Sequence, residues 1–261
     1  MLHQNTNMHG INKKTICIAG TNTCAINALN YLLKKKYKNF EIVALPDKSD
    51  NGRDKWQPSF KKFAKNKRVK IVSLEILYNI KNLYLFSLEY RNVLKVNCFK
   101  SKKLFNIHFS LLPKYRGCHT NYLQILNGEK KSGVTIHKIE KGIDTGKIIS
   151  KLTFKININD TSYENYFKLM KYSLIIFKKN LDKILNDNYK LTNQNLKRGT
   201  YYSRKSVNYK NIVILNKFNH DIKTHNKIRA LIFPPFQLPI YNGKKIIKSI
   251  YKNNKIKLKY K

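Results

Sequence analysis

Two short apolar segments on either side of an amphipathic segment limit the folds that this chain can adopt. Thr15 to Ala19 is apolar enough for a buried strand, and Glu41 to Leu45 is a second such segment. A strand, a helix and a further strand in this order predict a βαβ unit and therefore a parallel sheet. The segment between them has apolar residues at helical spacing, and its predicted buried face comprises Ala25, Ile26, Leu29, Leu32 and Leu33.

Later segments predict that the sheet continues. Val69 to Ser73 and Leu83 to Leu88 have the composition of further strands. Leu104 to His108 alternates polar and apolar residues, and Val134 to Ile139 is another strand candidate. The predicted fold class is therefore α/β with a mostly parallel sheet.

A helical pattern follows and gives way to a second region. Thr161 to Glu164 fits a capping box, which marks the start of a helix. We predict a disordered lead-in over residues 1–12, a catalytic domain over 13–195 and a small β-containing region over 196–261. The helix should bury one face, made of Phe167, Met170, Leu174, Phe177, Leu181 and Ile184.

The charge balance is extreme, with 53 Lys and Arg against 14 Asp and Glu and a net charge of +39. Such a surplus is typical of proteins that bind nucleic acid or anionic membranes. The lysines are spread over the whole length with abundant Asn, Ile and Tyr, however, which favours a coding bias toward AT-rich codons. Either origin favours anionic substrates.

Cysteine usage and hydropathy predict a reduced, cytoplasmic protein. The four cysteines form no CxxC pair and show no metal-ligand spacing, so no metal site is predicted. No apolar run approaches the roughly 18 residues that a membrane span needs.

Three polar side chains follow strand segments in a way that suggests catalysis. Asn106 and His108 are two residues apart on a predicted strand and therefore share a face. Asp144 lies in a glycine-flanked turn, Gly142 to Gly146, after another predicted strand. An amide, an imidazole and a carboxylate can serve as oxyanion donor, base and orienter. The alternative is a structural histidine and an aspartate that only makes a turn.

The motifs around these three residues resemble the formyltransferases that use N10-formyltetrahydrofolate. The resemblance covers residues 104–149 and rests on NxHxSLLPxYRG from Asn106, then NGE, GVTIH and GIDTG. It implies a Rossmann-like formyltransferase core, with Asn106, His108 and Asp144 as catalytic residues. It also implies N10-formyltetrahydrofolate as co-substrate, bound largely through backbone groups of two segments. The folate-binding candidates are Phe86, Ser87, Leu88, Ile139, Glu140, Gly142 and Asp144; Phe86 and Leu88 can equally be core strand residues.

Two segments before this region are candidates for substrate binding. The turn after the first strand lacks GxGxxG and a suitably placed acidic residue, so it does not predict a dinucleotide site. Thr21 and Asn22 could still offer backbone N–H groups to a phosphate. Trp56, the single tryptophan, could stack on a base or sugar beside Gln57, or pack as a lid on the core. The segment from Gly52 to Ser59 is similar to formyltransferases that act on dTDP-linked amino-dideoxy sugars.

The C-terminal region adds further candidates and a predicted hairpin. Asn242 and Gly243 lie between apolar runs and predict a hairpin turn. Similar regions of sugar formyltransferases help bind the nucleotide sugar and pair subunits, which implies a homodimer. The alternative is that these residues provide surface charge and the core of a small domain. The substrate-binding candidates here and in the YRG motif are Tyr115, Arg116, Tyr201, Arg204, Arg229 and Phe233, with the two later arginines as pyrophosphate ligands.

The resemblance predicts formyl transfer to the amine of a dTDP-linked amino sugar, taken as dTDP-4-amino-4,6-dideoxyglucose, for O-antigen biosynthesis. The choice between the C3 and C4 amines and between dTDP and UDP stays open. Methionyl-tRNA formyltransferase is the alternative within the family, and the glycinamide ribonucleotide enzyme lacks support because its Gly/Ser-rich first turn is absent. A non-catalytic, basic nucleic-acid-binding protein is the alternative from another class.

Overall fold

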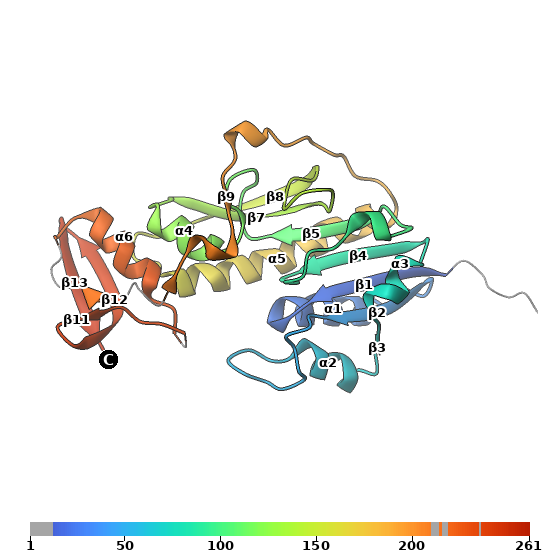
Figure 1. Cartoon of the computed structure of the whole chain (residues 1–261), viewed down its shortest axis with the longest axis horizontal. Helices are drawn as coiled ribbons and strands as arrows, with labels where there is room; N and C mark the ends of the chain where they lie inside the picture. The colour runs from blue at the N-terminus through green and yellow to red at the C-terminus, as the bar shows by residue number, and fades with distance from the viewer. Residues whose placement is uncertain (1–12, 210–213, 216–218, 235) are drawn as a thin grey trace, which may run out of the picture. The chain divides into compact units, whose positions relative to one another are not determined.

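The computed structural model describes residues 13–209, 214–215, 219–234 and 236–261 (Figure 1). The chain forms two compact units. The first contains the described residues up to Arg53 together with Ser59–Leu104, and the second contains Asp54–Pro58 together with Phe105–Lys261. The predicted lead-in, residues 1–12, lies outside the described residues.

The first unit confirms the predicted βαβ arrangement. Its strands lie in the order β3-β2-β1-β4, and each neighbouring pair is parallel. The predicted third strand is short, because only two of its residues join the sheet. The elements are β1 (Lys14–Gly20), α1 (Asn22–Lys35), β2 (Phe40–Pro46), α2 (Phe60–Asn66), β3 (Lys70–Ile71), α3 (Leu74–Tyr78), β4 (Leu83–Leu88) and the short η1 (Val96–Cys98).

The chain is closely packed at the start of α1, and the buried face of the helix differs from the predicted one. A Cβ atom on Gly20 would lie 2.3 Å from the Leu88 carbonyl oxygen and 2.9 Å from the Ala25 Cβ. Glycine is therefore required where the chain passes from β1 into α1. The predicted Ile26 and Leu33 are only half-buried, and the buried face instead consists of Cys24, Ala25, Ala28, Leu29 and Leu32.

The second unit begins with antiparallel strands and a long helix. β5 pairs with β7, and β7 pairs with β8, all antiparallel. The predicted α/β class is confirmed, with the four-stranded parallel arrangement in the first unit. The elements here are β5 (Leu104–His108), β6 (Arg116–Gly117), α4 (Thr120–Leu126), β7 (Lys131–Lys138), β8 (Ile148–Lys155), α5 (Ser162–Leu185), η2 (Leu196–Arg198), β9 (Tyr201–Tyr202) and η3 (Arg204–Ser206).

The capping box predicted for α5 is confirmed. The Thr161 hydroxyl accepts from the Glu164 N–H at 3.3 Å, and the Glu164 carboxylate accepts from the Thr161 N–H at 2.7 Å. The buried face was predicted less well. Phe167 is 40% exposed and Leu174 half-buried, because the helix turns residues such as Leu169 inward, where it packs on β7 and β8.

The C-terminal part forms a small sheet covered by one helix. The turn at Asn242 and Gly243, both with positive φ, joins antiparallel strands as predicted. Ile228 and Ile232 at the helix pack on Ile246 of the sheet. The elements are β10 (Ile214–Leu215), α6 (Ile222–Leu231), β11 (Ile240–Tyr241), β12 (Lys244–Lys252) and β13 (Lys255–Tyr260).

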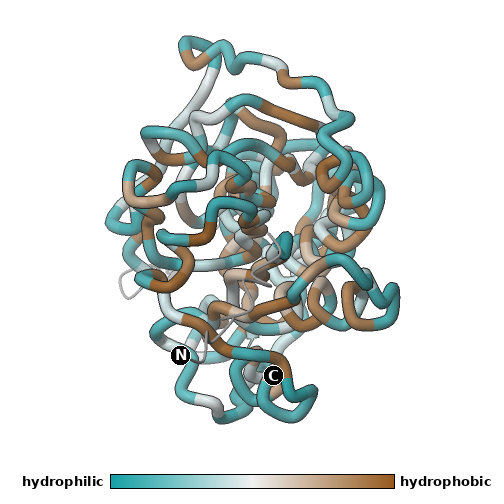
Figure 2. Tube along the Cα trace, turned by 90° about the vertical axis from the view of Figure 1, so that its right-hand side faces the viewer, coloured by the Kyte–Doolittle hydropathy of each residue, from teal (hydrophilic) through white to brown (hydrophobic). Residues whose placement is uncertain are grey.

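Apolar segments are short throughout the chain. Figure 2 shows brown, apolar stretches that alternate with teal, hydrophilic ones. Among the described residues, no helix has both the length and the apolar character needed to cross a bilayer.

The capping box gives a first test of this fold. We expect Thr161→Ala to lower the free energy of unfolding by about 1 kcal/mol, because the Glu164 N–H loses its acceptor. Thr161→Ser keeps a hydroxyl at this position and serves as the matched control. Denaturant titration measures the free energy of unfolding of both variants. An equal loss of free energy in the two would show that the capping hydroxyl contributes nothing.

Candidate active site

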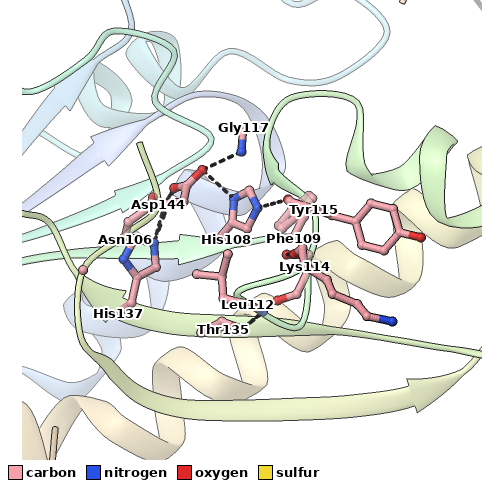
Figure 3. A network of polar contacts seen from close by, with 12 residues as sticks. Asn106, His108, Phe109, Leu112, Lys114, Tyr115, Gly117, Thr135, His137 and Asp144 are labelled. Atoms are coloured by element: carbon pink, nitrogen blue, oxygen red, sulfur yellow. Dashed lines mark hydrogen bonds and ion pairs between the residues drawn. The ribbon is translucent and has the colours of Figure 1, made fainter. Parts of the chain in front are cut away.

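Four polar side chains from two strands and a turn meet in the second unit (Figure 3). Asn106 and His108 lie on β5 and point to the same side, as their spacing predicted. Asn106 is directly opposite His137 of β7 in the antiparallel register, so these two side chains share a face as well. Asp144, in the turn after β7, lies beside Asn106 and His108.

The Asp144 carboxylate is the hub of this cluster. One oxygen accepts from the Asn106 amide at 3.2 Å, and the other accepts from the Gly117 N–H at 2.9 Å. The same two oxygens lie 3.5 Å from His137 Nε2 and His108 Nδ1, respectively. The carboxylate is only 12% exposed, so these groups take the place of water around it.

The pKa of Asp144 follows from these contacts. Burial alone would raise the pKa of this carboxyl, because it disfavours the charged form. The charge of His108 in its protonated form, the His137 ring and the Gly117 N–H act in the opposite direction and prevail. The net effect holds the pKa of Asp144 well below its usual range, so the group is an anion throughout the neutral pH range.

His108 is held at both ring nitrogens. Its Nε2 lies 2.7 Å from the main-chain oxygen of Tyr115. A carbonyl oxygen only accepts, so Nε2 carries a hydrogen. The other nitrogen, Nδ1, faces the Asp144 carboxylate. The neutral ring therefore has its lone pair on Nδ1, and a proton taken up there would lie beside a negative charge.

His137 is a functional candidate that the sequence analysis did not assign. Its Nδ1 donates to the Lys138 carbonyl at 2.7 Å, which leaves Nε2 as an acceptor, 3.2 Å from the Asn106 amide nitrogen. The two amide hydrogens of Asn106 thus face His137 and Asp144. His137 stands in the GVTIH motif, but only the pairing register of β5 and β7 shows that it lies opposite Asn106.

The turn that carries Asp144 is fixed by its own backbone and by Gln194. Asp144 has a φ of 54°, in the left-handed region. The Gln194 side chain donates to the carbonyls of Asp144 at 2.9 Å and Gly146 at 2.7 Å. A Cβ on Gly146 would lie 1.9 Å from the Lys138 carbonyl oxygen. Gln194 carried no signal in the sequence, because it lies next to the predicted domain boundary after residue 195.

A short parallel pairing ties a later segment to this site. Arg116 and Gly117 of β6 pair with Tyr201 and Tyr202 of β9. A Cβ on Gly117 would lie 2.2 Å from the Tyr202 carbonyl oxygen, so the approach requires glycine. Tyr201 is 48% exposed and Arg204 is also exposed, as substrate-binding side chains would be.

Two predicted substrate residues have their polar groups turned inward. The Tyr115 phenol is buried and bound to Glu129 and Asn127, so its side chain does not face a substrate. Arg229 is 2% exposed. Its guanidinium donates to the Asn226 side chain at 2.9 Å and to the Asp160 carbonyl at 2.6 Å, and so joins α6 to the loop before α5. A buried guanidinium with these partners does not fit the predicted role of Arg229 as a pyrophosphate ligand.

Trp56 belongs to an aromatic cluster of the second unit. Its ring lies 5.7 Å from Tyr166, 5.7 Å from Phe233 and 5.1 Å from the exposed Phe236. Gln57 is buried and donates to the Tyr166 hydroxyl at 2.9 Å. These contacts match the interpretation of the segment as a lid on the core, and a role in substrate binding stays a prediction.

The other predicted binding residues are divided between the units. Thr21 and Asn22 lie at the start of α1 in the first unit. Phe86, Ser87 and Leu88 form the buried end of β4, so the core-strand interpretation holds for the two apolar ones. In the second unit the folate candidates lie on the segment that leads to Asp144: Ile139 and Glu140 are half-buried, and Gly142 is exposed.

The lowered pKa of Asp144 predicts how an Asp144→Asn variant responds to acid. A depressed folded-state pKa adds stability above the unfolded-state value of about 4, and this stability is lost as the pH falls through the folded-state pKa. We therefore expect the stability difference between wild type and Asp144→Asn to be largest near neutral pH and to shrink below about pH 4.

Denaturant titrations at several pH values measure this difference. Asp182→Asn, at an exposed aspartate of α5, is the matched control. A difference for Asp144→Asn that does not change with pH would contradict the assignment.

Comparison with known proteins agrees with this geometry. The sequence model described as "Formyl transferase" matches residues 92–179. The crystal structure of WlaRD, a sugar 3N-formyl transferase in the presence of dTDP and 5-N-formyl-THF, is 47% identical with a TM-score of 0.86, covering 92% of this chain and 87% of that one. The N-formyltransferase from Helicobacter canadensis, in complex with folinic acid and dTDP-3-aminofucose, is 45% identical with a TM-score of 0.86, covering 92% and 88%.

Relatives with other names also match this chain. Methionyl-tRNA formyltransferase of Kosmotoga olearia is 32% identical over 82% of this chain and 72% of its own length. The bifunctional polymyxin resistance protein ArnA of Wigglesworthia glossinidia brevipalpis is 44% identical over 43% of this chain, which corresponds to only 17% of ArnA. From the motif, the assembled Asn106, His108 and Asp144, and these matches, we conclude that the chain belongs to the formyltransferase family.

Proposed function

We propose that this protein transfers the formyl group of N10-formyltetrahydrofolate to the amine of a dTDP-linked amino sugar. The observation that carries the proposal is the joined Asn106, His108 and Asp144 cluster. The choice of substrates is supported by the two solved relatives, which were crystallised with reduced formyl folates and with dTDP or a dTDP-amino sugar.

We further propose that the accepting amine is on C3 of the sugar. The family resemblance of the sequence favours the C4 amine of dTDP-4-amino-4,6-dideoxyglucose. The relatives at 47% and 45% identity are instead a sugar 3N-formyl transferase and an enzyme in complex with dTDP-3-aminofucose. Since this chain is nearly half identical to both, their C3 chemistry is the better expectation.

The side chains can move the proton that the reaction must transfer. A neutral amine attacks the formyl carbon, and the formyl oxygen becomes negatively charged. Asn106 can donate to this oxygen if it exchanges one of its two present acceptors, His137 or Asp144. The amine proton passes to Nδ1 of His108, whose new charge Asp144 stabilises. The same proton then goes to N10 of the folate as the carbon–nitrogen bond breaks.

The remaining features of the proposal follow from the relatives and the resemblance. A cytoplasmic location, a homodimer and a role in O-antigen biosynthesis belong to it as expectations. Transfer to methionyl-tRNA is the alternative within the family, supported by the relative from Kosmotoga olearia and by the net charge of +39.

A product assay separates these acceptors. The protein is incubated with N10-formyltetrahydrofolate and, in parallel, dTDP-3-aminofucose, dTDP-4-amino-4,6-dideoxyglucose or methionyl-tRNA. We expect mass spectrometry to show a formylated 3-amino sugar. Formylation of the 4-amino sugar alone would overturn the C3 assignment, and formylation of tRNA alone would overturn the sugar proposal.

Substitution of the cluster tests its catalytic role. We expect Asn106→Ala, His108→Ala and Asp144→Ala each to lower kcat on the order of 10²-fold or more, because each removes a group that acts on the developing charge or the proton. Asn188→Ala, at an exposed asparagine after α5, is the control for folding and handling. Any cluster variant that keeps more than about a tenth of wild-type kcat would remove its residue from catalysis.

A further inference from the structure

The Asn127–Gly128–Glu129 motif has no role in the chemistry described so far, yet it holds the phenol of Tyr115. The Tyr115 hydroxyl donates to the Glu129 carboxylate at 2.7 Å. It accepts from the Asn127 side-chain amide at 3.0 Å. Both the donor and the acceptor function of this hydroxyl are therefore used, and a carboxylate acceptor makes the first bond a strong one.

The turn that presents these two groups is itself well fixed. Asn127 caps the C-terminal end of α4, with its N–H on the Leu123 carbonyl at 2.9 Å. Gly128 adopts a positive φ of 68°, and the Glu129 N–H donates to the Gln124 carbonyl at 3.0 Å. The end of α4 thus provides a rigid holder for the phenol.

The backbone of Tyr115 has a conformation that needs such support. Its φ is 59°, in the left-handed region that a bulky residue adopts only at a cost. Its N–H donates to the Thr200 hydroxyl at 2.8 Å. Its ring stacks on Tyr202 at a centroid distance of 6.0 Å and an interplanar angle of 16°. Side chain, ring and N–H together keep the residue in this conformation.

The carbonyl of the same residue is the acceptor for His108. Figure 3 shows the Tyr115 main-chain oxygen beside the His108 ring, on the side opposite Asp144, at 2.7 Å from Nε2. The direction of this carbonyl depends on the φ and ψ angles around Tyr115. Any relaxation of the backbone toward ordinary angles would turn the oxygen away from His108.

We propose that Tyr115 and Glu129 are positioning residues. Together they form a clamp that keeps the His108 hydrogen on Nε2 and the lone pair on Nδ1. This inference rests on the proposed function, in which Nδ1 receives the amine proton. Without the clamp, the ring can place its hydrogen on Nδ1 toward Asp144, and this tautomer has no free lone pair where the proton must arrive. The Asn127–Gly128–Glu129 motif thereby determines the tautomer of His108 without contacting it.

Three variants and one control test the clamp. Tyr115→Phe removes the hydroxyl, Glu129→Ala removes its acceptor, and Glu129→Gln keeps an oxygen that can still accept. Lys114→Gln is the control, because its exposed ammonium lies 3.9 Å from the same carboxylate without contacting the phenol. We expect Tyr115→Phe and Glu129→Ala to lower kcat about tenfold with little change in the KM for the sugar, and Glu129→Gln to retain most of the kcat.

A second readout reports on the histidine without substrate. Two-bond proton–nitrogen NMR spectra distinguish the two imidazole tautomers, and His108→Ala identifies the signals of His108. We expect the Nε2–H form in the wild type and in Lys114→Gln, and a mixture in Tyr115→Phe and Glu129→Ala. An unchanged tautomer and an unchanged kcat in both of these variants would overturn the proposal.

The two readouts also separate this inference from the proposed function. A protein that formylates no sugar, but whose His108 tautomer changes in Tyr115→Phe, would overturn the sugar proposal and support the clamp. A lower melting temperature with neither a tautomer change nor a fall in kcat would show that the network serves only folding.

Discussion

The site depends on one buried anion, the carboxylate of Asp144. Removing a carboxylate from water is costly unless partners replace the lost solvation. Here the Asn106 side-chain amide and the Gly117 N–H donate hydrogen bonds to it, and the His108 and His137 rings lie 3.5 Å away. These partners come from β5, β6 and β7, so the contacts around Asp144 also hold the backbone segments of the site together. Stability and reactivity therefore share one set of interactions.

The sequence predicted those features that depend on local rules. The two-residue spacing of Asn106 and His108 placed them on one face, and the Thr161 capping box and the Asn242–Gly243 turn follow from short motifs. The role of His137 required knowledge of which residue of β7 lies opposite Asn106, and a register between strands is not contained in either strand alone.

The directions of side chains also could not be predicted from the sequence. Arg229 looked like an anion ligand because arginine often is one, yet its guanidinium donates to the Asn226 side chain and the Asp160 carbonyl. Tyr115 was predicted to contact substrate, whereas its hydroxyl faces Glu129 and its carbonyl faces His108. In both cases the residue type indicates which hydrogen bonds the side chain can form. The fold decides which partners it binds.

The pairing of Gly117 with Tyr202 bears on what constitutes the smallest working piece of this chain. Residues 104–149 hold every side chain of the Asn106, His108 and Asp144 cluster, and a motif search sees them as a complete unit. The N–H that binds Asp144 nevertheless belongs to a strand whose neighbour arrives more than 80 residues later. A recombination or truncation before residue 201 would preserve the motif but remove β9, the strand that pairs with Gly117. The segment around β9 is therefore expected to be inherited together with the catalytic motif, even though the motif ends more than 50 residues before it.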